Sequence, residues 1–354
     1  MKVVFLGLSI TSSWGNGHAT NYRALVRELT RRGHEVLFCE RDVPWYAAAR
    51  DLSEPPWGRT SLYGSVEELA QRHGEDVAGA DLVVVGSYVP DGVAVCDWAL
   101  DRAGGAVAFY DIDTPVTLGK LRRGECEYLA AEQVRRFDLY LSFTGGPTLR
   151  VLERELGARR AIAFYCLVDP EAYQPVAAEV RWDLGYLGTY SEDRQPLLER
   201  LLIEPARRAP RLRFVVAGPQ YPDEIEWPDN VERIEHLAPE EHPSFYAAQR
   251  FSLNVTRAEM REAGWSPSVR LFEAAACETP VISDRWDGLE RIFAADEEIL
   301  IAETSEDVLD YLAEAGESER AEIAARARQR VLAEHTAEQR CRLLEEEVAG
   351  VAAR

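Results

Sequence analysis

Short apolar runs alternate with helical segments along the chain, and this alternation limits the fold more than any other feature of the sequence. Residues 2–10 form an apolar run typical of a buried strand, and the apolar residues from Tyr22 to Leu29 then recur every three or four positions, as on one face of a helix. Further buried strands are predicted at 81–88 and 106–113. Apolar strands separated by helices are typical of a parallel sheet covered by helices on both faces.

A second series of strands and helices begins near Trp182, so the sequence predicts two doubly wound parallel-sheet domains of the α/β class. A length of 354 residues also favours two domains. We expect a Rossmann-like domain at residues 1–168, a hinge at 169–181 and a second Rossmann-like domain at 182–334. Because the functional loops of such sheets follow the carboxyl ends of the strands, the expected ligand site is a cleft between two facing domains.

The composition argues against several classes of partner. The formal net charge is −21, which disfavours binding to nucleic acid or to anionic membranes. No apolar run is long enough to cross a membrane, and the apolar start MKVVFLGLSI lacks the cleavage site of a secretory signal, so we expect a cytoplasmic protein that is not integral to a membrane. The six cysteines are scattered without any CxxC spacing, which favours buried thiols in a reducing compartment over a zinc site.

The sequence SPSVRLFE predicts a helix that begins at a cap and carries one carboxylate about two turns later. Ser266 suits the N-cap and Pro267 the first helical position, where the missing N–H costs nothing. The backbone N–H groups of Ser268 and Val269 then point out of the helix start, where they can bind a diphosphate. Glu273 lies further along, where a carboxylate can accept hydrogen bonds from a ribose diol. This arrangement predicts a nucleotide-sugar site.

Two arginines near this segment are further donor-binding candidates, and each has an alternative interpretation. Arg257 follows the strand residues SLNV, where a cation can stabilise the charge of a departing diphosphate and so act in catalysis. The alternative is a surface arginine on a loop. Arg270 is expected to bind the donor beside Glu273, but the spacing of the two residues also suits an ion pair on a helix surface.

Candidate acceptor-binding residues lie at strand ends of the first domain. Asp111 and Asp113 end the run AVAFYDID, and two alternate carboxylates could hold a metal. No comparable extra carboxylate cluster is recognisable, so we expect no metal. Asp113 is expected to contact an acceptor hydroxyl or to serve as a catalytic base, and the alternative is a helix cap. Asp91 begins a turn that could line the acceptor pocket.

The loop GNGHAT places Gly17 and His18 at the start of the first helix. Glycine lets the backbone approach a ligand closely, and His18 could act as a general base or touch the acceptor. It could equally well only hold the loop by hydrogen bonding. Thr20 stands where a dinucleotide fingerprint has its third glycine, although Glu40 lies near the distance expected of a ribose-binding residue. A Rossmann oxidoreductase is therefore a weaker alternative.

Several motifs together resemble a known family. SPSVRLFEAAACETPVISD, NVTRAEM, LGYLGTYSEDRQP, YCLVDPEAY and SSWGNGHATNYRAL resemble the CgeB-like spore-maturation glycosyltransferases, which are similar to the fourth family of retaining glycosyltransferases. The resemblance covers nearly the whole chain. It implies the GT-B fold, an acceptor-binding first domain, a second domain that binds a nucleotide sugar, and a C-terminal helix at about 335–354 that packs back on the first domain.

The resemblance also implies roles for individual donor-binding residues. Glu273 corresponds to the glutamate that holds the donor ribose, and Ser268 and Val269 correspond to the backbone that holds the diphosphate. The resemblance further places a loop that faces the phosphates at Gly188 and Thr189, with Arg194 as the nearby cation. It places the main chain that meets the base at His236 and Leu237.

The chain departs from the broader family at one position. That family has a second glutamate eight residues before the ribose glutamate, and it touches the transferred sugar, but Trp265 stands there in this sequence. The departure leaves the sugar contact open.

Taken together, the residues and the resemblance predict a hexosyltransferase-like enzyme that moves a sugar from a nucleoside diphosphate sugar to an acceptor hydroxyl. We expect a UDP-sugar donor, with dTDP- or GDP-sugars as alternatives, no prosthetic group, metal-independent chemistry and retention of the anomeric configuration. Asp113, His18 and Arg257 are the catalytic candidates. The alternatives are a nucleotide-sugar epimerase or hydrolase of the same fold, and a catalytically silent protein that binds sugar nucleotides.

Overall fold

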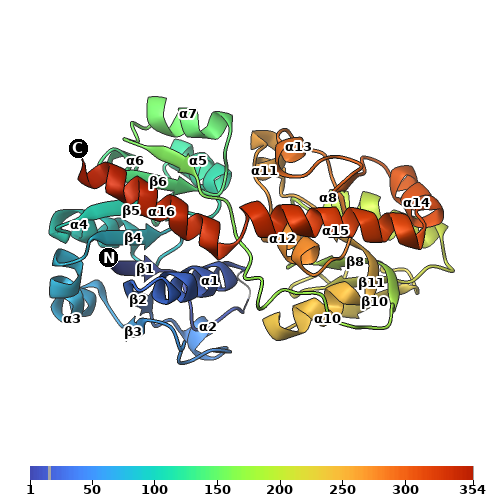
Figure 1. Ribbon diagram of the computed structural model, residues 1–354, viewed down its shortest axis with the longest axis horizontal. Coiled ribbons are helices and arrows are strands. Elements are labelled where there is room, and N and C mark those ends of the chain that lie inside the picture. Colours follow the sequence, from blue (N-terminus) through green and yellow to red (C-terminus); the bar gives the residue numbers. More distant parts are fainter. Residues whose placement is uncertain (15–16, 354) are drawn as a thin grey trace. The chain divides into compact units, whose positions relative to one another are not determined.

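Two parallel sheets form the framework of the protein in a computed structural model that describes residues 1–14 and 17–353 (Figure 1). Each sheet belongs to its own compact unit. Unit 1 comprises Met1–Leu167 together with Ala337–Arg354, and unit 2 comprises Val168–Thr336. The chain therefore leaves unit 1 once and returns to it at the C-terminal end.

Seven strands form the sheet of unit 1, in the order β3-β2-β1-β4-β5-β6-β7. All of them pair in parallel, and Val3 of the central β1 lies opposite Val36 in β2 and Leu82 in β4. The reversal of strand order between β1 and β4 makes the sheet doubly wound. The strands are β1 (Lys2–Gly7), β2 (Glu35–Arg41), β3 (Arg59–Tyr63), β4 (Leu82–Gly86), β5 (Ala106–Asp111), β6 (Leu139–Ser142) and β7 (Ala161–Ala163).

Helices cover both faces of this sheet because its strands are apolar on both sides. Val4 and Leu6 pack with residues of α3 and α4, whereas Phe5, between them, meets Tyr22 of α1 edge to face. The described helices of unit 1 are α1 (His18–Arg31), α2 (Pro44–Ala47), α3 (Val66–Ala78), α4 (Gly92–Arg102), α5 (Thr114–Arg123), α6 (Ala131–Val134), α7 (Pro147–Arg154) and α16 (Ala337–Ala352).

The helix α16, red in Figure 1, packs against α1 although more than 300 residues separate them in the sequence. It buries Leu344 and Val348. Glu345 accepts hydrogen bonds from Arg32 at 2.8 Å and 2.5 Å, and it lies 2.6 Å from His34 Nε2. Apolar contact and an ion pair therefore both hold α16 on unit 1.

Six strands form the sheet of unit 2, in the order β10-β9-β8-β11-β12-β13, again all parallel. The order reverses between β8 and β11, so the loops after these two strands lie where doubly wound sheets bind ligands. The strands are β8 (Trp182–Leu187), β9 (Phe214–Ala217), β10 (Val231–Ile234), β11 (Gln249–Asn254), β12 (Val281–Ser283) and β13 (Leu300–Ile301).

The helices of unit 2 pack on this sheet and on one another. The buried α12 lies against α15, where the Phe272 ring stacks on His335 at 4.3 Å and Arg328 donates to the carbonyl of Ala276 at 3.1 Å. The described helices are α8 (Gln195–Leu198), α9 (Glu204–Arg208), α10 (His242–Ala247), α11 (Ala258–Ala263), α12 (Val269–Ala276), α13 (Leu289–Ile292), α14 (Ser305–Glu314) and α15 (Glu317–Glu334).

The sequence leads to expectations about the cysteines, about membrane-spanning segments and about metal ligands, and the structure bears on each. The six cysteines are thiols, and all but Cys126 are buried. Over residues 1–14 and 17–353, no helix is both long and apolar enough to cross a membrane. Within the same residues, no three or more His, Cys, Asp or Glu side chains are grouped so that they could hold a metal ion.

Candidate functional site

The start of α12 is the centre of the candidate site in unit 2. The sequence predicted that this helix begins at Pro267 with Ser266 as its N-cap, and that prediction is wrong, because the helix begins at Val269 and its N-cap is Ser268. Ser268 has extended backbone angles (φ −80°, ψ 152°), and its hydroxyl donates to Asn254 Oδ1 at 2.6 Å. This contact with the end of β11 fixes where the helix starts.

The shifted start still presents backbone donors. Leu271 N–H donates to the carbonyl of Ser268 at 3.1 Å. The N–H groups of Ser268, Val269 and Arg270 belong to the N-cap and the first turn, where backbone N–H groups lack the acceptor that the next turn provides inside a helix. They lie at the positive end of the helix dipole, which attracts anions.

Glu273 is buried on the same helix, with 4% of its surface exposed. Tyr246 of α10 donates its hydroxyl hydrogen to Glu273 Oε2 at 3.1 Å, and His242 Nδ1 lies 3.9 Å from the same oxygen. The Tyr173 hydroxyl lies 3.1 Å from His242 Nδ1. Burial, and then the Glu273 charge, raise the pKa of both tyrosines, so they remain protonated beside the carboxylate.

Arg270 lies at the carboxyl ends of the central strands. Its guanidinium donates to the carbonyl of Leu187 and, at 3.0 Å, to Asn254 Oδ1, and it lies over the Tyr186 ring at 4.6 Å. Arg270 and Glu273 form no ion pair in the described part of the chain, so the surface-pair interpretation is wrong. The two side chains belong to separate buried networks.

The loop after β8, Gly188–Thr189, is held from several sides. The hydroxyl of Tyr221 donates to the Gly188 carbonyl at 3.0 Å, and Arg194 donates to the Thr189 carbonyl at 2.7 Å. A Cβ atom on Gly218 would lie 2.1 Å from the Gly188 oxygen, and Gly218 has φ +141°. The loop therefore approaches β9 as closely as glycine allows.

Arg257 follows β11, as predicted, and is the N-cap of α11. Its Nε atom lies 3.5 Å from Asp193, and its Nη2 atom lies 3.8 Å from Glu259. His236 and Leu237 follow β10, and His236 is exposed. The structure thus places all predicted donor-binding residues of unit 2 in loops and helix starts that follow β8, β10 and β11, apart from Glu273, which lies inside α12.

Trp265 and Asp284 lie beside this edge of the sheet. Trp265 has φ +51°, its N–H donates to the Asp287 carbonyl at 2.6 Å, and its ring packs on Gly288. Asp284 directly follows β12 and accepts both donors of Thr256 through Oδ1, each at 2.9 Å. Burial raises the pKa of Asp284 to about 6. The sequence did not identify Asp284 as a site residue, because its hydrogen-bond partner Thr256 follows β11, a strand distant in the sequence.

In unit 1, the structure brings His18 and Asp113 to one residue that the sequence did not single out, Tyr88. Tyr88 follows β4 with φ +64°, and its hydroxyl donates to Asp113 Oδ2 at 3.0 Å. The His18 ring stacks on Tyr88 at 6.3 Å, and the Tyr128 ring lies 4.7 Å from Tyr88. A left-handed backbone at an aromatic residue is a signal of a constrained site, but it can be seen only in the fold.

Asp111 does not join this surface. It is fully buried, and it accepts hydrogen bonds from Tyr140 at 2.6 Å and from Thr117 at 2.8 Å. Complete burial raises its pKa to about 6, although the two hydrogen bonds oppose the shift. The prediction that Asp111 contacts an acceptor is therefore wrong. Its place in the structure is to support the β5 end that carries Asp113.

The other predicted residues of unit 1 have structural partners. Asp91 is the N-cap of α4 with φ +57°, and its carboxylate lies 3.4 Å from Arg41. Gly17 is the exposed N-cap of α1. Glu40 accepts hydrogen bonds from Ile10 N–H and from both donors of Thr11, at 2.6–2.9 Å. Because the chain itself occupies the Glu40 carboxylate, the structure argues against a dinucleotide ribose there.

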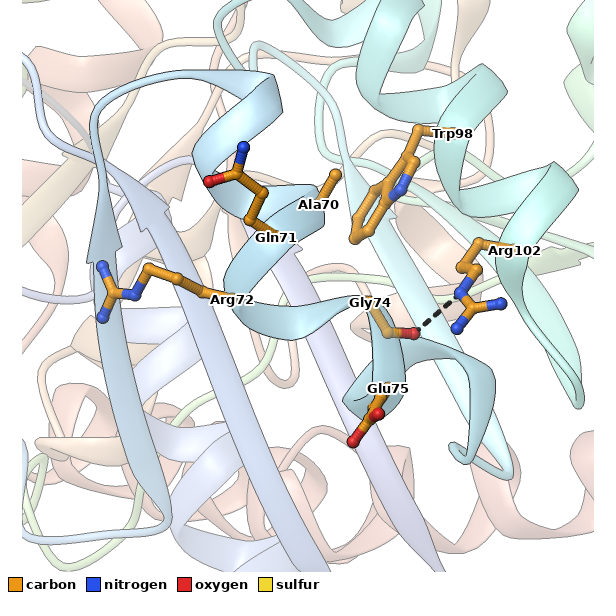
Figure 2. Close-up of a pocket in the computed structure, with 7 residues that line it drawn as sticks. All are labelled: Ala70, Gln71, Arg72, Gly74, Glu75, Trp98 and Arg102. Atoms are coloured by element: carbon orange, nitrogen blue, oxygen red, sulfur yellow. Dashed lines mark hydrogen bonds between the residues drawn. The ribbon is translucent and has the colours of Figure 1, made fainter.

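A hollow of about 570 Å³ lies elsewhere, between α3 and α4. Figure 2 shows Trp98 and Arg102 facing Gly74, whose carbonyl accepts from Arg102 Nε at 2.9 Å. Its lining residues lie in the middle of α3 and the second half of α4, away from the strand ends that lead into these helices. The strand-end geometry therefore identifies the candidate site better than the size of this hollow.

A comparison with protein-family models finds a match that includes α12, the centre of the candidate site of unit 2. Residues 194–346 match a protein-family model described as "Glycosyl transferase-like". No curated protein matches the chain significantly.

Several solved structures share the fold over the whole chain. A sucrose-phosphate synthase from Thermosynechococcus elongatus is 14% identical with a TM-score of 0.71, and 100% of each chain is covered. Anabaena HepE in complex with UDP and glucose is 14% identical with a TM-score of 0.71, covering 99% of this chain and 100% of the other. An α-glucosyltransferase in complex with UDP-glucose and DNA is 14% identical with a TM-score of 0.72, covering 98% of each chain. The predicted fold class is confirmed: two Rossmann-like parallel-sheet domains of the GT-B type.

Proposed function

We propose that the protein is a glycosyltransferase that moves a sugar from a nucleoside diphosphate sugar to an acceptor hydroxyl. The observation that carries the proposal is the start of α12, where the N–H groups of Ser268, Val269 and Arg270 lie on the same helix as the buried Glu273. Such amides bind phosphate, and a carboxylate accepts strong hydrogen bonds from ribose hydroxyls. The family match over residues 194–346 includes this helix and supports the same function.

Unit 2 binds the donor in this proposal. The α12 amides and the loop Gly188–Thr189 hold the diphosphate, with Arg194 close by, and Glu273 holds the ribose. The main chain near His236 and Leu237 meets the base. The donor is a UDP-sugar rather than a dTDP- or GDP-sugar, because UDP is bound in the structures of HepE and the α-glucosyltransferase.

Unit 1 binds the acceptor, with His18 and Asp113 at the acceptor hydroxyl. The bond between the anomeric carbon and the donor phosphate oxygen breaks, and its electron pair leaves with the diphosphate. The acceptor oxygen forms the new bond on the same face, and its proton passes to the departing phosphate. Arg257 stabilises the negative charge that develops. No prosthetic group or metal enters this scheme, which follows the resemblance to CgeB-like enzymes.

One observation favours a second candidate function, a protein that binds the donor but transfers nothing. The ring of Trp265 packs on Gly288 where the broader family has a sugar-contacting glutamate. Under this alternative the nucleotide binds normally and no acceptor is glycosylated.

A thermal-shift screen of UDP-, dTDP- and GDP-sugars tests donor binding, since a ligand that binds only the folded state raises its melting temperature. We expect UDP-sugars to give the largest shift. Glu273→Gln keeps the shape but loses the charge, so UDP affinity should fall about tenfold. Glu278→Gln, an exposed neighbour just beyond α12, is the matched control and should bind UDP normally.

Transfer is then measured with the stabilising donor and a panel of acceptors, and the product anomer is read by NMR. Full UDP binding by Glu273→Gln would place the nucleotide elsewhere. Turnover of the donor to a new sugar without any acceptor would favour an epimerase or hydrolase, and an inverted linkage would exclude the phosphate as the base.

A further inference from the structure

Aromatic side chains follow three adjacent strands at the carboxyl edge of the unit 1 sheet. Trp45 lies in α2 after β2, Trp14 follows β1, and Tyr88 follows β4. The sheet order β2-β1-β4 places these three positions side by side. Trp14 is 41% exposed and Trp45 is 55% exposed. Apolar rings that follow neighbouring strands at one edge of a sheet can form a contiguous surface, and a contiguous apolar surface marks a binding site.

The segment that carries Trp14 is hydrogen-bonded to the residues that follow α2, the helix of Trp45. Ser12 donates its hydroxyl hydrogen to the Ala49 carbonyl at 2.7 Å. Ser13 N–H donates to Asp51 at 2.8 Å, and Arg23 of α1 forms two hydrogen bonds with the same carboxylate, at 2.8 Å and 2.9 Å. Polar contacts therefore hold the backbone before Trp14 and after the helix of Trp45, as a preformed binding surface requires.

The third aromatic residue, Tyr88, is hydrogen-bonded to Asp113, the carboxylate that would meet an acceptor hydroxyl. Burial, and then the Asp113 charge, raise the pKa of Tyr88, so its phenol stays protonated and donates to Asp113. Asp113 is partly exposed, and a carboxylate has capacity for further donors. The left-handed backbone of Tyr88 (φ +64°) holds ring and hydroxyl in this position.

The charges of this edge select against an anionic ligand. Four cations on the elements and loops of this part of unit 1 lie within ion-pair distance of a carboxylate, which leaves little positive potential to attract a phosphate. In the described residues the pairs are Arg23 with Asp51, Arg41 with Asp91, Arg50 with Asp42, and Lys120 with Glu127. Asp113 adds a further negative charge at the end of the row.

We propose that Trp45, Trp14 and Tyr88 form an acceptor subsite for a neutral oligosaccharide, whose terminal hydroxyl meets Asp113. Sugar rings present apolar C–H faces that pack on aromatic rings and polar edges that hydrogen bond. Neighbouring strands lie about 4.8 Å apart, so three strand ends span about 10 Å, enough for more than one sugar ring. This inference rests on the proposed function, because it names the acceptor class of that reaction.

A glycan array with the full chain tests the subsite, using neutral oligosaccharides and their phosphorylated counterparts. We expect binding to neutral oligosaccharides, about tenfold weaker in Trp14→Ala and in Trp45→Ala. Trp14→Phe keeps an aromatic face and should retain most of the affinity. Val180→Ala is the control, since it removes an exposed apolar side chain of unit 2. Melting temperatures show that each variant is folded.

UDP binding measured on the same samples separates this proposal from the proposed function. Three results would overturn the subsite: a protein that binds UDP but no neutral glycan, binding confined to phosphorylated glycans, or unchanged glycan affinity in both alanine variants. Glycan binding by a protein that binds no nucleotide would instead contradict the donor site while supporting the aromatic subsite.

Discussion

Arg270 and Glu273 show how little spacing alone says about a residue. They stand three positions apart, which on a surface helix favours an ion pair. Here both are buried, and their partners come from different strands and helices: Leu187 and Asn254 for the arginine, Tyr246 for the glutamate. The sequence identified both as candidates, but their partners lie 16 to 83 residues away and could not be predicted from local pattern.

Asp284 leads to a prediction about stability and pH. Its pKa is raised to about 6 by burial, from an ordinary value of 3.8, and its Oδ2 atom is buried without a hydrogen-bond partner in the described chain. The folded state thus holds the proton more tightly than the unfolded state, so this residue lowers stability as the pH rises from about 4 to about 6. Asp284→Asn removes the charge and keeps the Thr256 hydrogen bonds.

We therefore expect Asp284→Asn to be more stable than the parent by about 1–2 kcal/mol at pH 8 and no more stable at pH 3.5. Urea denaturation at the two pH values measures the difference. A variant that is destabilised at pH 8 but not at pH 3.5 would contradict this prediction and show that the ionised carboxylate makes a favourable contact.

At the scale of elements, the strands and the start of α1 at His18 were predictable, but the start of α12 was not. The runs at 81–88 and 106–113 contain β4 and β5, because continuous apolar sequence reflects burial on both faces of the sheet. The start of α12 moved from Pro267 to Val269 because the Ser268 hydroxyl binds Asn254, a tertiary contact that the cap pattern does not encode.

The close approach of β8 and β9 gives a prediction at this scale. In Gly218→Ala the new Cβ would meet the Gly188 carbonyl, and the positive φ adds strain, so we expect a loss of about 2–3 kcal/mol of unfolding free energy and weaker UDP binding. Gly33→Ala has a positive φ too, but nothing lies within 4 Å of its Cβ. It should lose only about 1 kcal/mol and bind UDP normally.

Denaturation curves measure the stability of the two variants, and UDP titrations measure their affinity. Gly33→Ala reports backbone strain alone, whereas Gly218→Ala adds the steric overlap with Gly188. If Gly218→Ala bound UDP as well as Gly33→Ala does, the Gly188–Thr189 loop would have no part in holding the diphosphate.

At the scale of the whole molecule, the return of α16 joins distant parts of the sequence into one unit. Leu344 and Val348 are buried in it, and Glu345 reaches Arg32 and His34. The Ala-, Glu- and Arg-rich tail gives a helix from composition alone. Its packing partner was expected from a family resemblance, because periodicity shows which face is apolar but not what covers it.

The Arg32 hydrogen bond is the main cause that lowers the pKa of Glu345, to about 2. The ionised Glu345 therefore contributes its full stabilisation above about pH 4.5, and this stabilisation is lost as the pH falls toward 2. Because the pair is partly solvated, Glu345→Gln should cost only about 1 kcal/mol at neutral pH. Hydrogen exchange of α1 and α16 amides measures the loss, with the exposed Glu346→Gln as control. Faster exchange in both variants alike would argue against the specific pair.

The position of α16 also has a consequence for how the protein is made on the ribosome. Residues 168–336 form unit 2 without a break, so this part can finish folding as soon as it emerges. The first 167 residues must wait, with the surface that α16 will cover still open to water, until translation has passed through all of unit 2. The part of the polypeptide that is synthesised first is thus completed last, and its apolar surface stays exposed during that interval.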